Sequence, residues 1–487
     1  MSTPRIVDLR SADPQATVTP GSQLESGDAV TPDLRPDGEE PSRLLEEGLI
    51  ASTLHLVRQA GIVLVVQIVG AGLSYGLQVL LARLLHASDY GIYTYVFVWV
   101  SFVALLAGLG YPAASIRFLP VYRVKDDWPR IHGFMRTAFR MTFATAIGVA
   151  VCGVIGVEAL HAFGAVGSPS AVMLGALLVP ALAGSLLYTE IARAGNRVEI
   201  AFIPALIGRP VLIAIGAAAF FVLDGTLGSS AALIATLVAA YVVLAVQYAL
   251  TRHLFDGPQT GTKPVVELRE WFGVGITLLT VSAFVTTLLQ VDIVIVGALR
   301  GTRDAGIYAA ASKTATLVAF VIVAINAAAA PQFASLWSLG RVEELQRLVS
   351  KLAGLIFWPS LAIAIGLAVL SGPILDLFGP EFSVARPALL ILLVGQIINA
   401  AAGSVGYLLT LTGYHREAAR ALGFSALACI LLTVAGVWAF GLVGAALGTT
   451  TGFLLWNGAL YWLVVRRLNI YPSIFTTLPM PRRRTRD

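Results

Sequence analysis

The sequence predicts an all-α, polytopic membrane protein with about twelve transmembrane helices in two parallel six-helix lobes around a central cavity. Three observations lead to this fold class: the composition, the distribution of basic residues and an internal repeat. Of the 487 residues, 57% are hydrophobic and 13% are charged, whereas soluble domains average about 45–50% and about 25%. Many apolar runs contain about 20 residues, which is the length that crosses about 30 Å of hydrocarbon.

The apolar runs divide the chain into spans, a linker and two tails. Residues 1–45 contain six prolines and no apolar run, so they are expected to form a disordered cytoplasmic tail. We expect the N-terminal lobe at 46–255, a cytoplasmic inter-lobe linker at 256–270, the C-terminal lobe at 271–466 and a basic cytoplasmic tail at 467–487. The predicted spans cover 60–82, 91–116, 137–157, 170–191, 200–222, 230–251, 271–298, 306–330, 353–371, 384–411, 418–439 and 442–465.

Basic residues fall on alternate connections between these spans. With both termini on one side, 28 of the 33 Lys and Arg residues lie on that side, four lie on the other, and Lys313 lies inside a span. This asymmetry follows the positive-inside rule, so both termini are expected in the cytoplasm. The C-terminal stretch "PRRRTRD" then acts as a topology signal or contacts anionic lipid. No nucleic-acid partner is expected.

A polar motif, Asp-x-Gly-Ile-Tyr, occurs at 89–93 and again 215 residues later at 304–308. Each copy follows the first span of a lobe on the outer side. We expect its Asp to cap the next helix, its Gly to allow close backbone approach and its Tyr to lie at the membrane interface. Two further pairs of segments have nearly the same offset: 194–201 with 412–419, and 225–228 with 441–444.

The repeat also predicts how the two lobes are related. Each half has six spans, an even number, so both halves enter and leave the membrane on the same side. The repeats are therefore parallel and related by a pseudo-two-fold axis along the membrane normal. Transporters of this kind bind their substrate between the halves and rock them against each other.

The sequence lacks the motifs of the common catalytic classes. It has no Gly-rich loop that ends in Gly-Lys-Ser/Thr, no histidine pair with metal-ligand spacing and no Gly-x-Ser-x-Gly nucleophile elbow. Its loops are too short to form a soluble catalytic domain. We therefore expect no enzymatic activity, no metal and no organic cofactor.

Two charges lie inside predicted spans, where a charge is costly and faces protein or water. Asp292 lies about two turns from the outer end of the seventh span, and Lys313 lies about two turns into the eighth. One interpretation is a structural ion pair between them. The other makes Asp292 a coupling site for a proton or a sodium ion, with Lys313 as its charge partner or as a contact for a substrate phosphate.

Further candidates for substrate binding lie at or within the spans. Arg117, Arg140 and Arg209 lie near the inner ends of their spans. Snorkelling toward the lipid headgroups explains them without a ligand. Alternatively, they line an inward-open cavity and bind an anion, since a guanidinium donates two bonds to phosphate. Polar residues that could bind sugar hydroxyls there, or bond across helices, include Gln78, Gln290 and Asn326.

Two segments resemble a known family. The stretch "LLARLLHASDYGIYTYVFVWVSFVALLAGLGYPAASIRFLP" (80–120) is similar to the N-terminal signature of the polysaccharide-biosynthesis family of lipid-linked oligosaccharide, O-antigen type, flippases. The stretch "QVDIVIVGALRGTRDAGIYAAASKTATLVAFVIVAINAAAAPQFASLWSLGR" resembles that family's seventh and eighth spans. The resemblance covers most of 55–466. The family belongs to a superfamily that also holds multidrug exporters and the lipid II flippase, whose two extra C-terminal spans this sequence lacks.

The resemblance implies a secondary-transport flippase of the bacterial plasma (inner) membrane. Its expected cargo is an undecaprenyl-pyrophosphate-linked oligosaccharide, moved from the inner to the outer leaflet for surface polysaccharide such as lipopolysaccharide, or for exopolysaccharide. The implied partners are this lipid-linked oligosaccharide, membrane lipid, a polysaccharide polymerase and glycosyltransferases. The alternative is a cation-coupled exporter of small amphiphilic molecules, of the multidrug type. A third class is a non-transporting membrane scaffold for polysaccharide assembly.

Overall fold

The computed structural model describes residues 40–162, 169–256, 263–412, 414–472 and 474. The chain divides into two compact units, residues 1–55 and 56–487. Every helix and turn considered below lies in the second unit, apart from the start of the first helix. Within the described ranges all regular elements are helical. The tails predicted at the two ends fall largely outside these ranges, at 1–39 and 475–487.

The elements of the first half are α1 (Glu40–Ala107), α2 (Tyr111–Val124), α3 (Trp128–Ala162), α4 (Pro169–Ala194), α5 (Val198–Ile203), the π-helical turn η1 (Pro204–Gly208), α6 (Arg209–Asp224) and α7 (Ser229–Thr251). Those of the second half are α8 (Leu268–Arg300), α9 (Thr302–Thr316), α10 (Ala319–Ser338), α11 (Val342–Val369), α12 (Ser371–Phe378), the 3-10 turn η2 (Pro380–Ala385), α13 (Arg386–Ala402), α14 (Val405–Leu411) and α15 (His415–Leu468).

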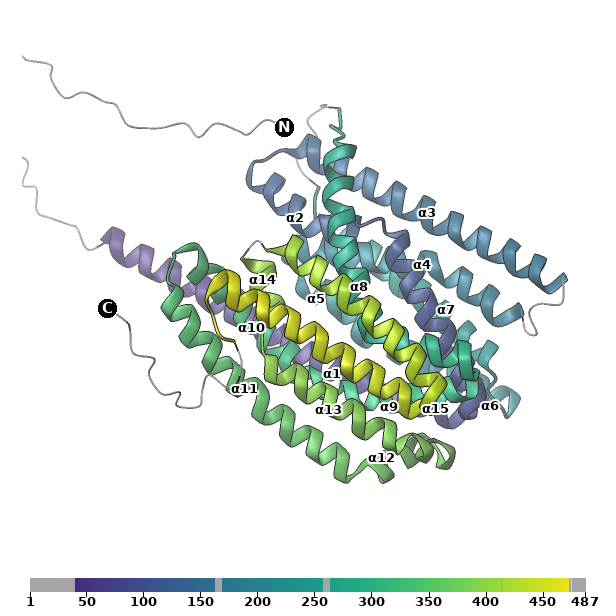
Figure 1. The fold of residues 1–487 in the computed structure, drawn as a ribbon. Coiled ribbons are helices and arrows are strands. Elements are labelled where there is room, and N and C mark those ends of the chain that lie inside the picture. The colour runs from purple at the N-terminus through teal and green to yellow at the C-terminus, as the bar shows by residue number, and fades with distance from the viewer. Residues whose placement is uncertain (1–39, 163–168, 257–262, 413, 473, 475–487) are drawn as a thin grey trace, which may run out of the picture. The chain divides into compact units, whose positions relative to one another are not determined.

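Helices α2–α7 pack mainly with one another, and so do α9–α15. In Figure 1 the first group lies to the upper right and the second to the lower left. Nine of the described helices are long and apolar enough to cross a membrane, and counting the pair α9 and α10, bent by 45°, as one span makes ten. Two of these ten segments each contain a reversal of the chain and therefore cross twice, which gives the twelve predicted spans.

The first reversal lies inside α1. His86 has non-helical angles, φ 58° and ψ 172°. The Tyr90 hydroxyl donates to Oε1 of Gln78 at 2.9 Å, although a straight helix would separate residues twelve positions apart by about 18 Å. The chain therefore turns back at His86, so that α1 supplies the first and second spans.

The second reversal lies at Gly441 of α15, where φ is 58°. The two arms pack through small residues. A Cβ built on Gly436 would lie 2.2 Å from the carbonyl oxygen of Gly444, and one built on Gly452 would lie 2.6 Å from Sγ of Cys429. Small side chains at these positions let the eleventh and twelfth spans approach closely, as in other membrane helix pairs.

Four predicted spans are not continuous helices, contrary to the sequence-based expectation. The second is broken at Gly110 (φ 78°) and the tenth at Gly403 (φ 70°). The fifth passes through the π turn η1, which begins at Pro204, a residue that cannot donate a helical hydrogen bond. The eighth bends between α9 and α10. Glycine at the first two breaks adopts left-handed angles at little steric cost.

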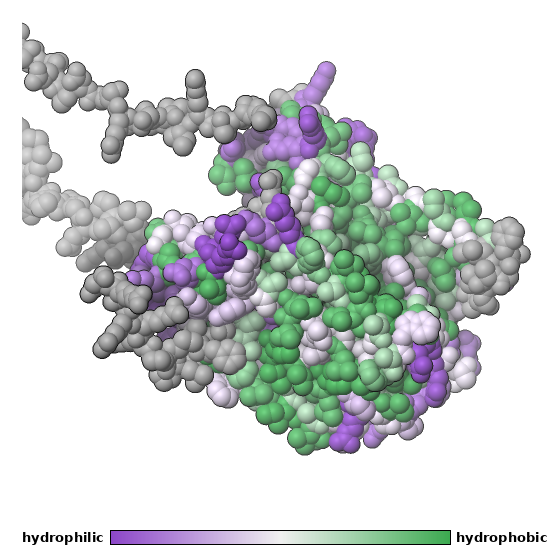
Figure 2. Space-filling view, viewed as in Figure 1, coloured by the Kyte–Doolittle hydropathy of each residue, from purple (hydrophilic) through white to green (hydrophobic). Residues whose placement is uncertain are grey.

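The surface matches a membrane environment. Figure 2 shows a broad hydrophobic area over the helices, with hydrophilic side chains gathered toward its margins. Large apolar side chains such as Phe424 and Trp438 are mostly exposed, which suits contact with lipid. We call the end with the turns near 126, 196 and 340 the basic end. The end with the turns at 86, 225, 301, 379 and 441 is the opposite end.

Helix α8 belongs to both halves of the molecule. Toward the basic end, Trp271 packs in a buried cluster with side chains of α2, α3 and α4. Toward the opposite end, Ile293 and Val296 pack in a cluster that includes α9 and α13 of the second half and α1, α4 and α7 of the first. Between these ends, residues 280–287 are half-buried or exposed. The first span of the second half is thus anchored in the first half as well.

Candidate functional site

The two copies of the repeated motif meet at the opposite end. Gly91 lies in the second span, within α1, and Gly306 lies near the start of α9. A Cβ built on Gly91 would lie 1.7 Å from the carbonyl oxygen of Thr302, and one built on Gly306 would lie 2.9 Å from Cα of Gly91. Such distances leave room only for glycine. The expected close approach of the backbones is confirmed, and the two copies of the motif pack against each other.

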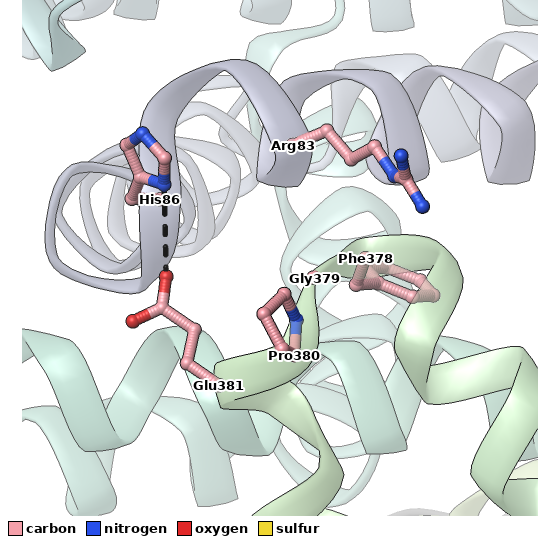
Figure 3. A pocket seen from close by; sticks show the side chains of 6 residues that line it. All are labelled: Arg83, His86, Phe378, Gly379, Pro380 and Glu381. Carbon is pink, nitrogen blue, oxygen red and sulfur yellow. Dashed lines mark ion pairs between the residues drawn. The ribbon is translucent and has the colours of Figure 1, made fainter.

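Polar contacts close the same end (Figure 3). Oε1 of Glu381, in η2, accepts the backbone N–H of Ala87 at 2.7 Å and lies 4.0 Å from Nδ1 of His86. Arg83 donates from Nε to the carbonyl oxygen of Leu377 at 2.7 Å. Because Ala87 begins the helix after the reversal, a carboxylate of the second half caps a helix of the first half. The opposite-end seal is defined by Arg83, Gly91, Gly306 and Glu381.

The tyrosine of each motif is buried rather than interfacial. The Tyr93 hydroxyl lies 3.2 Å from Oγ1 of Thr236, and the Tyr308 hydroxyl lies 3.4 Å from Oγ1 of Thr449. Each threonine lies on the last span of its half. The expectation of an interfacial position is therefore wrong, because each ring fills a core position and its hydroxyl finds a partner inside the protein.

The aspartate of the second motif does not cap its helix as expected. Helix α9 begins at Thr302 with Gly301 as its N-cap residue. Asp304 lies in the first turn, where it accepts a bond from Nε of Arg300 at 3.3 Å. Glycine takes the cap position because the chain there has a φ of 93°. The carboxylate still lies next to the positive end of the helix dipole.

Asp292 is the centre of a polar group inside the second half. It is 2% exposed. Its Oδ1 accepts the backbone N–H of Ile293 at 2.9 Å. Its Oδ2 accepts the hydroxyls of Tyr308 at 2.9 Å and Thr449 at 3.2 Å. These donors come from α8, α9 and α15, so one buried carboxylate connects three spans.

Lys313 does not form the ion pair with Asp292 that the sequence suggested. No Lys313–Asp292 contact is among the ion pairs within 4.0 Å in the described part of the chain, although the two charges interact at longer range. Lys313 lies five positions after Tyr308 on α9, which turns the two side chains about 140° apart around the helix. Tyr308 faces Asp292, so Lys313, which is half-buried, faces elsewhere.

The counterpart of Asp292 in the first half is apolar. The offset of 215 residues places Leu77 at the corresponding position. Leu77 is 6% exposed, and the Tyr93–Thr236 contact forms beside it without a carboxylate. The repeat can therefore pack around leucine, which means that packing alone does not require the acid at position 292.

The three predicted arginines do not converge on one place. Arg117 is exposed, with its guanidinium 6.0 Å from the ring centre of Phe118. Arg140 is also exposed and lines a pocket with Arg136 at the basic end. Arg209 begins α6, is half-buried and lies close enough to Tyr93 to interact with it electrostatically. Only Arg209 therefore lies next to a residue of the repeated motif.

Two of the three predicted polar residues have structural hydrogen bonds. Gln78 accepts the bond that spans the reversal in α1. The buried Asn326 of α10 accepts a bond from Oγ of Ser404, at the break between α13 and α14. Gln290 lines a pocket of about 80 Å³ between α8 and the second span, together with Trp99 and Phe102. Gln290 is therefore the one that faces a space between the two halves.

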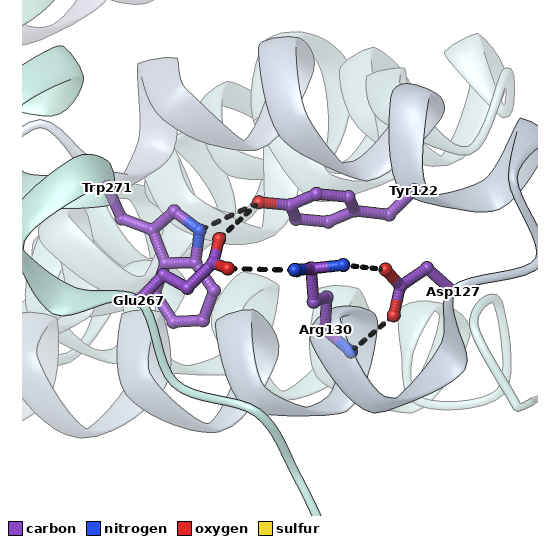
Figure 4. A network of polar contacts seen from close by, with 5 residues as sticks. All are labelled: Tyr122, Asp127, Arg130, Glu267 and Trp271. Carbon is purple, nitrogen blue, oxygen red and sulfur yellow. Dashed lines mark hydrogen bonds and ion pairs between the residues drawn. The ribbon is translucent and has the colours of Figure 1, made fainter.

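A polar network joins the two halves at the basic end (Figure 4). Trp271 donates from Nε1 to the Tyr122 hydroxyl at 3.0 Å. Nε of Arg130 donates to Oε1 of Glu267 at 3.0 Å, and Arg130 also pairs with Asp127. The network fixes the start of α8 to α2 and α3. The bond from Arg130 holds the pKa of the Asp127 carboxyl below its usual range.

The partners of Asp292 and the residues of the seal were not identified from the sequence. The sequence did contain a signal for the partners of Asp292: Thr236 and Thr449 are 213 residues apart, nearly the 215-residue offset between the two copies of the motif. No local pattern marks Glu381, because the groups that it contacts, the backbone N–H of Ala87 and the side chains of His86 and Arg303, lie far from it in the sequence. Among the described residues, no group of three His, Cys, Asp or Glu side chains could hold a metal ion.

Comparisons with known proteins place these features in context. A family model described as "Polysaccharide biosynthesis protein" matches residues 56–337. No curated protein sequence matches the chain. An inward-facing multidrug resistance MATE family transporter of the MOP superfamily has 16% sequence identity and a TM-score of 0.64, with 82% of this chain and 94% of that chain covered.

Two more solved structures show the same fold. An outward-facing MATE family transporter of the MOP superfamily has 15% identity and a TM-score of 0.59, with 85% of this chain and 95% of that chain covered. A mutant of the Vibrio cholerae MATE transporter VcmN has 15% identity and a TM-score of 0.60, with 86% and 98% covered. At these identities the likeness establishes the fold of two lobes.

Proposed function

Because the chain belongs to the polysaccharide biosynthesis protein family, we propose that it is a secondary-transport flippase for an undecaprenyl-pyrophosphate-linked oligosaccharide. It is a multi-pass membrane protein with a transporter fold. In this proposal both termini are cytoplasmic in the bacterial plasma membrane, and the cargo moves from the inner to the outer leaflet. A polysaccharide polymerase and glycosyltransferases would act on the same lipid-linked material.

The observation that carries the proposal is the opposite-end seal. The seal joins two copies of one repeated motif across the two halves, at Gly91 and Gly306. A parallel-repeat transporter releases its cargo by parting its halves at one end and joining them at the other. In this structure the repeated motifs join the halves at the opposite end, which the charge asymmetry predicts to be the outer side, whereas the basic-end network joins them through the start of α8. Release there requires the seal to part.

In this proposal Asp292 couples an ion to this movement. Its carboxylate holds Tyr308, which lies two residues after Gly306 in the seal. A proton or a sodium ion on Asp292 would compete with the Tyr308 and Thr449 hydroxyls for the same oxygen atoms. Binding of the cation would therefore change how the start of α9 is held against α8 and α15, and thus the stability of the seal.

In this proposal Arg209 and Lys313 contact the pyrophosphate. Both are half-buried within spans, where an unpaired charge is costly unless it faces water or a ligand. Among the described ion pairs neither has a carboxylate within 4.0 Å. Arg209 can donate two parallel bonds to a phosphate group, whereas Lys313 acts as a point charge.

The cargo is tested in a bacterial strain that lacks the protein and carries variants on a plasmid. We expect loss of the protein to stop polysaccharide export and to leave lipid-linked oligosaccharide on the cytoplasmic side. Arg209→Lys is expected to impair export nearly as much as Arg209→Ala, because lysine loses the paired bonds. Exposed Arg347→Lys is the control. Normal export without the protein would refute the proposal, and full export by Arg209→Lys would remove Arg209 from the site.

The alternative is a cation-coupled exporter of small amphiphilic molecules. The pocket lined by Trp99, Phe102 and Gln290 favours it, because apolar and aromatic walls with a few polar groups suit such compounds. If this is the function, loss of the protein should raise the sensitivity of the strain to ethidium by several-fold and leave polysaccharide export intact.

A further inference from the structure

A short segment runs along one face of α3 at the basic end. Residues 263–267, here called the strap, lead into α8. The backbone N–H of Val265 donates to the carbonyl oxygen of Pro129 at 3.1 Å. A Cβ built on Gly133 would lie 1.8 Å from the Val265 carbonyl oxygen. The strap therefore lies directly on α3, and glycine at position 133 allows this contact.

The same face of α3 continues past the strap to two arginines. Arg136 and Arg140 follow Gly133 at three and seven positions, a spacing that places all three on one face of a helix. Both arginines are exposed. Neither has a carboxylate within 4.0 Å among the described ion pairs, whereas Arg130, one turn before Gly133, is paired with Asp127 and Glu267.

The strap and α3 enclose a pocket of about 280 Å³. Arg136 and Arg140 form its basic wall, and Met141, Pro264, Val266 and Leu268 form its apolar wall. No acidic side chain belongs to this lining. Glu267, the acid of the strap, is turned away toward Arg130. The pocket is thus cationic on one side and apolar on the other, and the strap forms part of it.

Its place in the bundle fits a lipid headgroup. Arg136 and Arg140 lie at the start of the third span, where the basic end meets the apolar surface. A phosphate at this depth can accept two bonds from each guanidinium. The exposed apolar side chains of Met141, Val266 and Leu268 lie where acyl chains begin. Basic pockets between spans on the cytoplasmic side are known to hold anionic headgroups.

We propose that this α3–strap pocket binds the phosphate headgroup of an anionic phospholipid of the inner leaflet, which clamps the strap to α3. Two features favour a phospholipid over free phosphate: the apolar wall is more extensive than the basic one, and the pocket lies at the inner end of the third predicted span, where headgroups are expected. The volume suits a headgroup and leaves no room for an attached oligosaccharide. The site is separate from Asp292, Arg209 and the opposite-end seal.

The test uses the full-length protein and dioleoylphosphatidylglycerol, with dioleoylphosphatidylcholine as the neutral control. We expect phosphatidylglycerol to raise the unfolding temperature by about 5 °C over phosphatidylcholine, by preferential binding to the folded state. Native mass spectrometry should show phosphatidylglycerol retained on the unaltered protein. Arg136→Gln with Arg140→Gln should weaken retention by about tenfold or more, since each arginine contributes about 1 kcal/mol near an anionic surface. Arg347→Gln, which replaces an exposed arginine on α11, should leave the retention of phosphatidylglycerol unchanged.

Several results would overturn the proposal. Equal retention of the two lipids by the unaltered protein would show that no anionic site exists, and this result does not depend on any variant folding. Unchanged retention by the double variant would place the lipid elsewhere. If inorganic phosphate gave the same temperature shift, the pocket would bind free phosphate rather than lipid. Displacement of phosphatidylglycerol by equimolar undecaprenyl phosphate would assign the pocket to the transported lipid instead.

Discussion

Asp292 accepts hydrogen bonds from Tyr308 and Thr449, whereas Leu77 occupies the corresponding position in the first half. The presence of Asp292 inside a span was evident from the sequence, because a charged residue is conspicuous in an apolar run. Its partners were not, because hydroxyl groups on distant spans give no local signal. Lys313 was the basic residue predicted inside a neighbouring span, but the rotation of α9 turns it away from the Tyr308 face.

A double-mutant cycle tests this arrangement. Asp292 and Lys313 interact at longer range but lack a direct contact, so the effects of Asp292→Asn and Lys313→Gln on the free energy of unfolding should deviate from additivity by no more than about 0.5 kcal/mol. The double variant should be folded but inactive in export if Asp292 couples the cycle. Denaturant unfolding and an export assay measure the two effects separately. A double variant that regains both stability and export would show that the pair is structural.

The Asp127 pKa makes a prediction about acid stability. The bond from Arg130 lowers the folded-state pKa of the Asp127 carboxyl. The resulting stability is present above the unfolded-state pKa of about 3.9 and is lost as the pH falls through the lower folded-state value. Between pH 5 and pH 3, the unfolding temperature of the unaltered protein should fall by roughly 1–3 °C more than that of Asp127→Asn. Parallel curves for the two proteins would contradict this assignment.

At the scale of the element, glycine placement decides where helices meet. The motif at 89–93 and its copy were found in the sequence, and the close approach of their glycines was predicted correctly. That the two copies touch each other could not be predicted, because a repeat offset says nothing about distance in space. The breaks at Gly110 and Gly403 were also missed, since glycine occurs in many continuous membrane helices.

Alanine at Gly91 should prevent closure of the opposite end. Its methyl group would lie 1.7 Å from the carbonyl oxygen of Thr302, so the halves must separate there. Ala305→Cys, at a position buried in the present structure, reports the change when Cys152 is replaced by serine. An impermeant maleimide should label this cysteine at least several times faster in Gly91→Ala. Gly72→Ala on the same helix meets no atom within 4 Å and is the control. Equal labelling rates would show that the seal does not depend on this contact.

For the whole molecule, composition and charge predicted an all-helical membrane protein, and the internal repeat predicted its two lobes. These properties follow from burial of apolar runs in lipid, which acts on every span alike. The lobe boundaries were placed in the connection at 256–270 because that segment is polar. The sequence could not reveal that Trp271, beyond this connection, packs with Phe134 and Tyr122 of the first half.

The orientation of the whole protein in the membrane can be tested with reporter fusions. The charge asymmetry of 28 to four places the turns near 126, 196 and 340 in the cytoplasm and those near 226 and 379 outside. A reporter enzyme that is active only outside the cytoplasm should be at least tenfold more active when fused after residue 226 or 379. Higher activity from fusions at 126, 196 or 340 would reverse the orientation.

Helix α8 is held by packing at both of its ends. Trp271 fixes one end in the first half, and Ile293 and Val296 hold the other end in a cluster of side chains from both halves. If the halves rotate relative to each other, the helix must bend between Trp271 and Val281, because Val281, Phe284 and Val285 pack against a core cluster of the second half. Thr280 donates its hydroxyl to the carbonyl oxygen of Ile276 at 2.7 Å, a bond that loosens a helix locally. Bending of this stretch would raise the free energy of the rotated arrangement and so favour return to the present one.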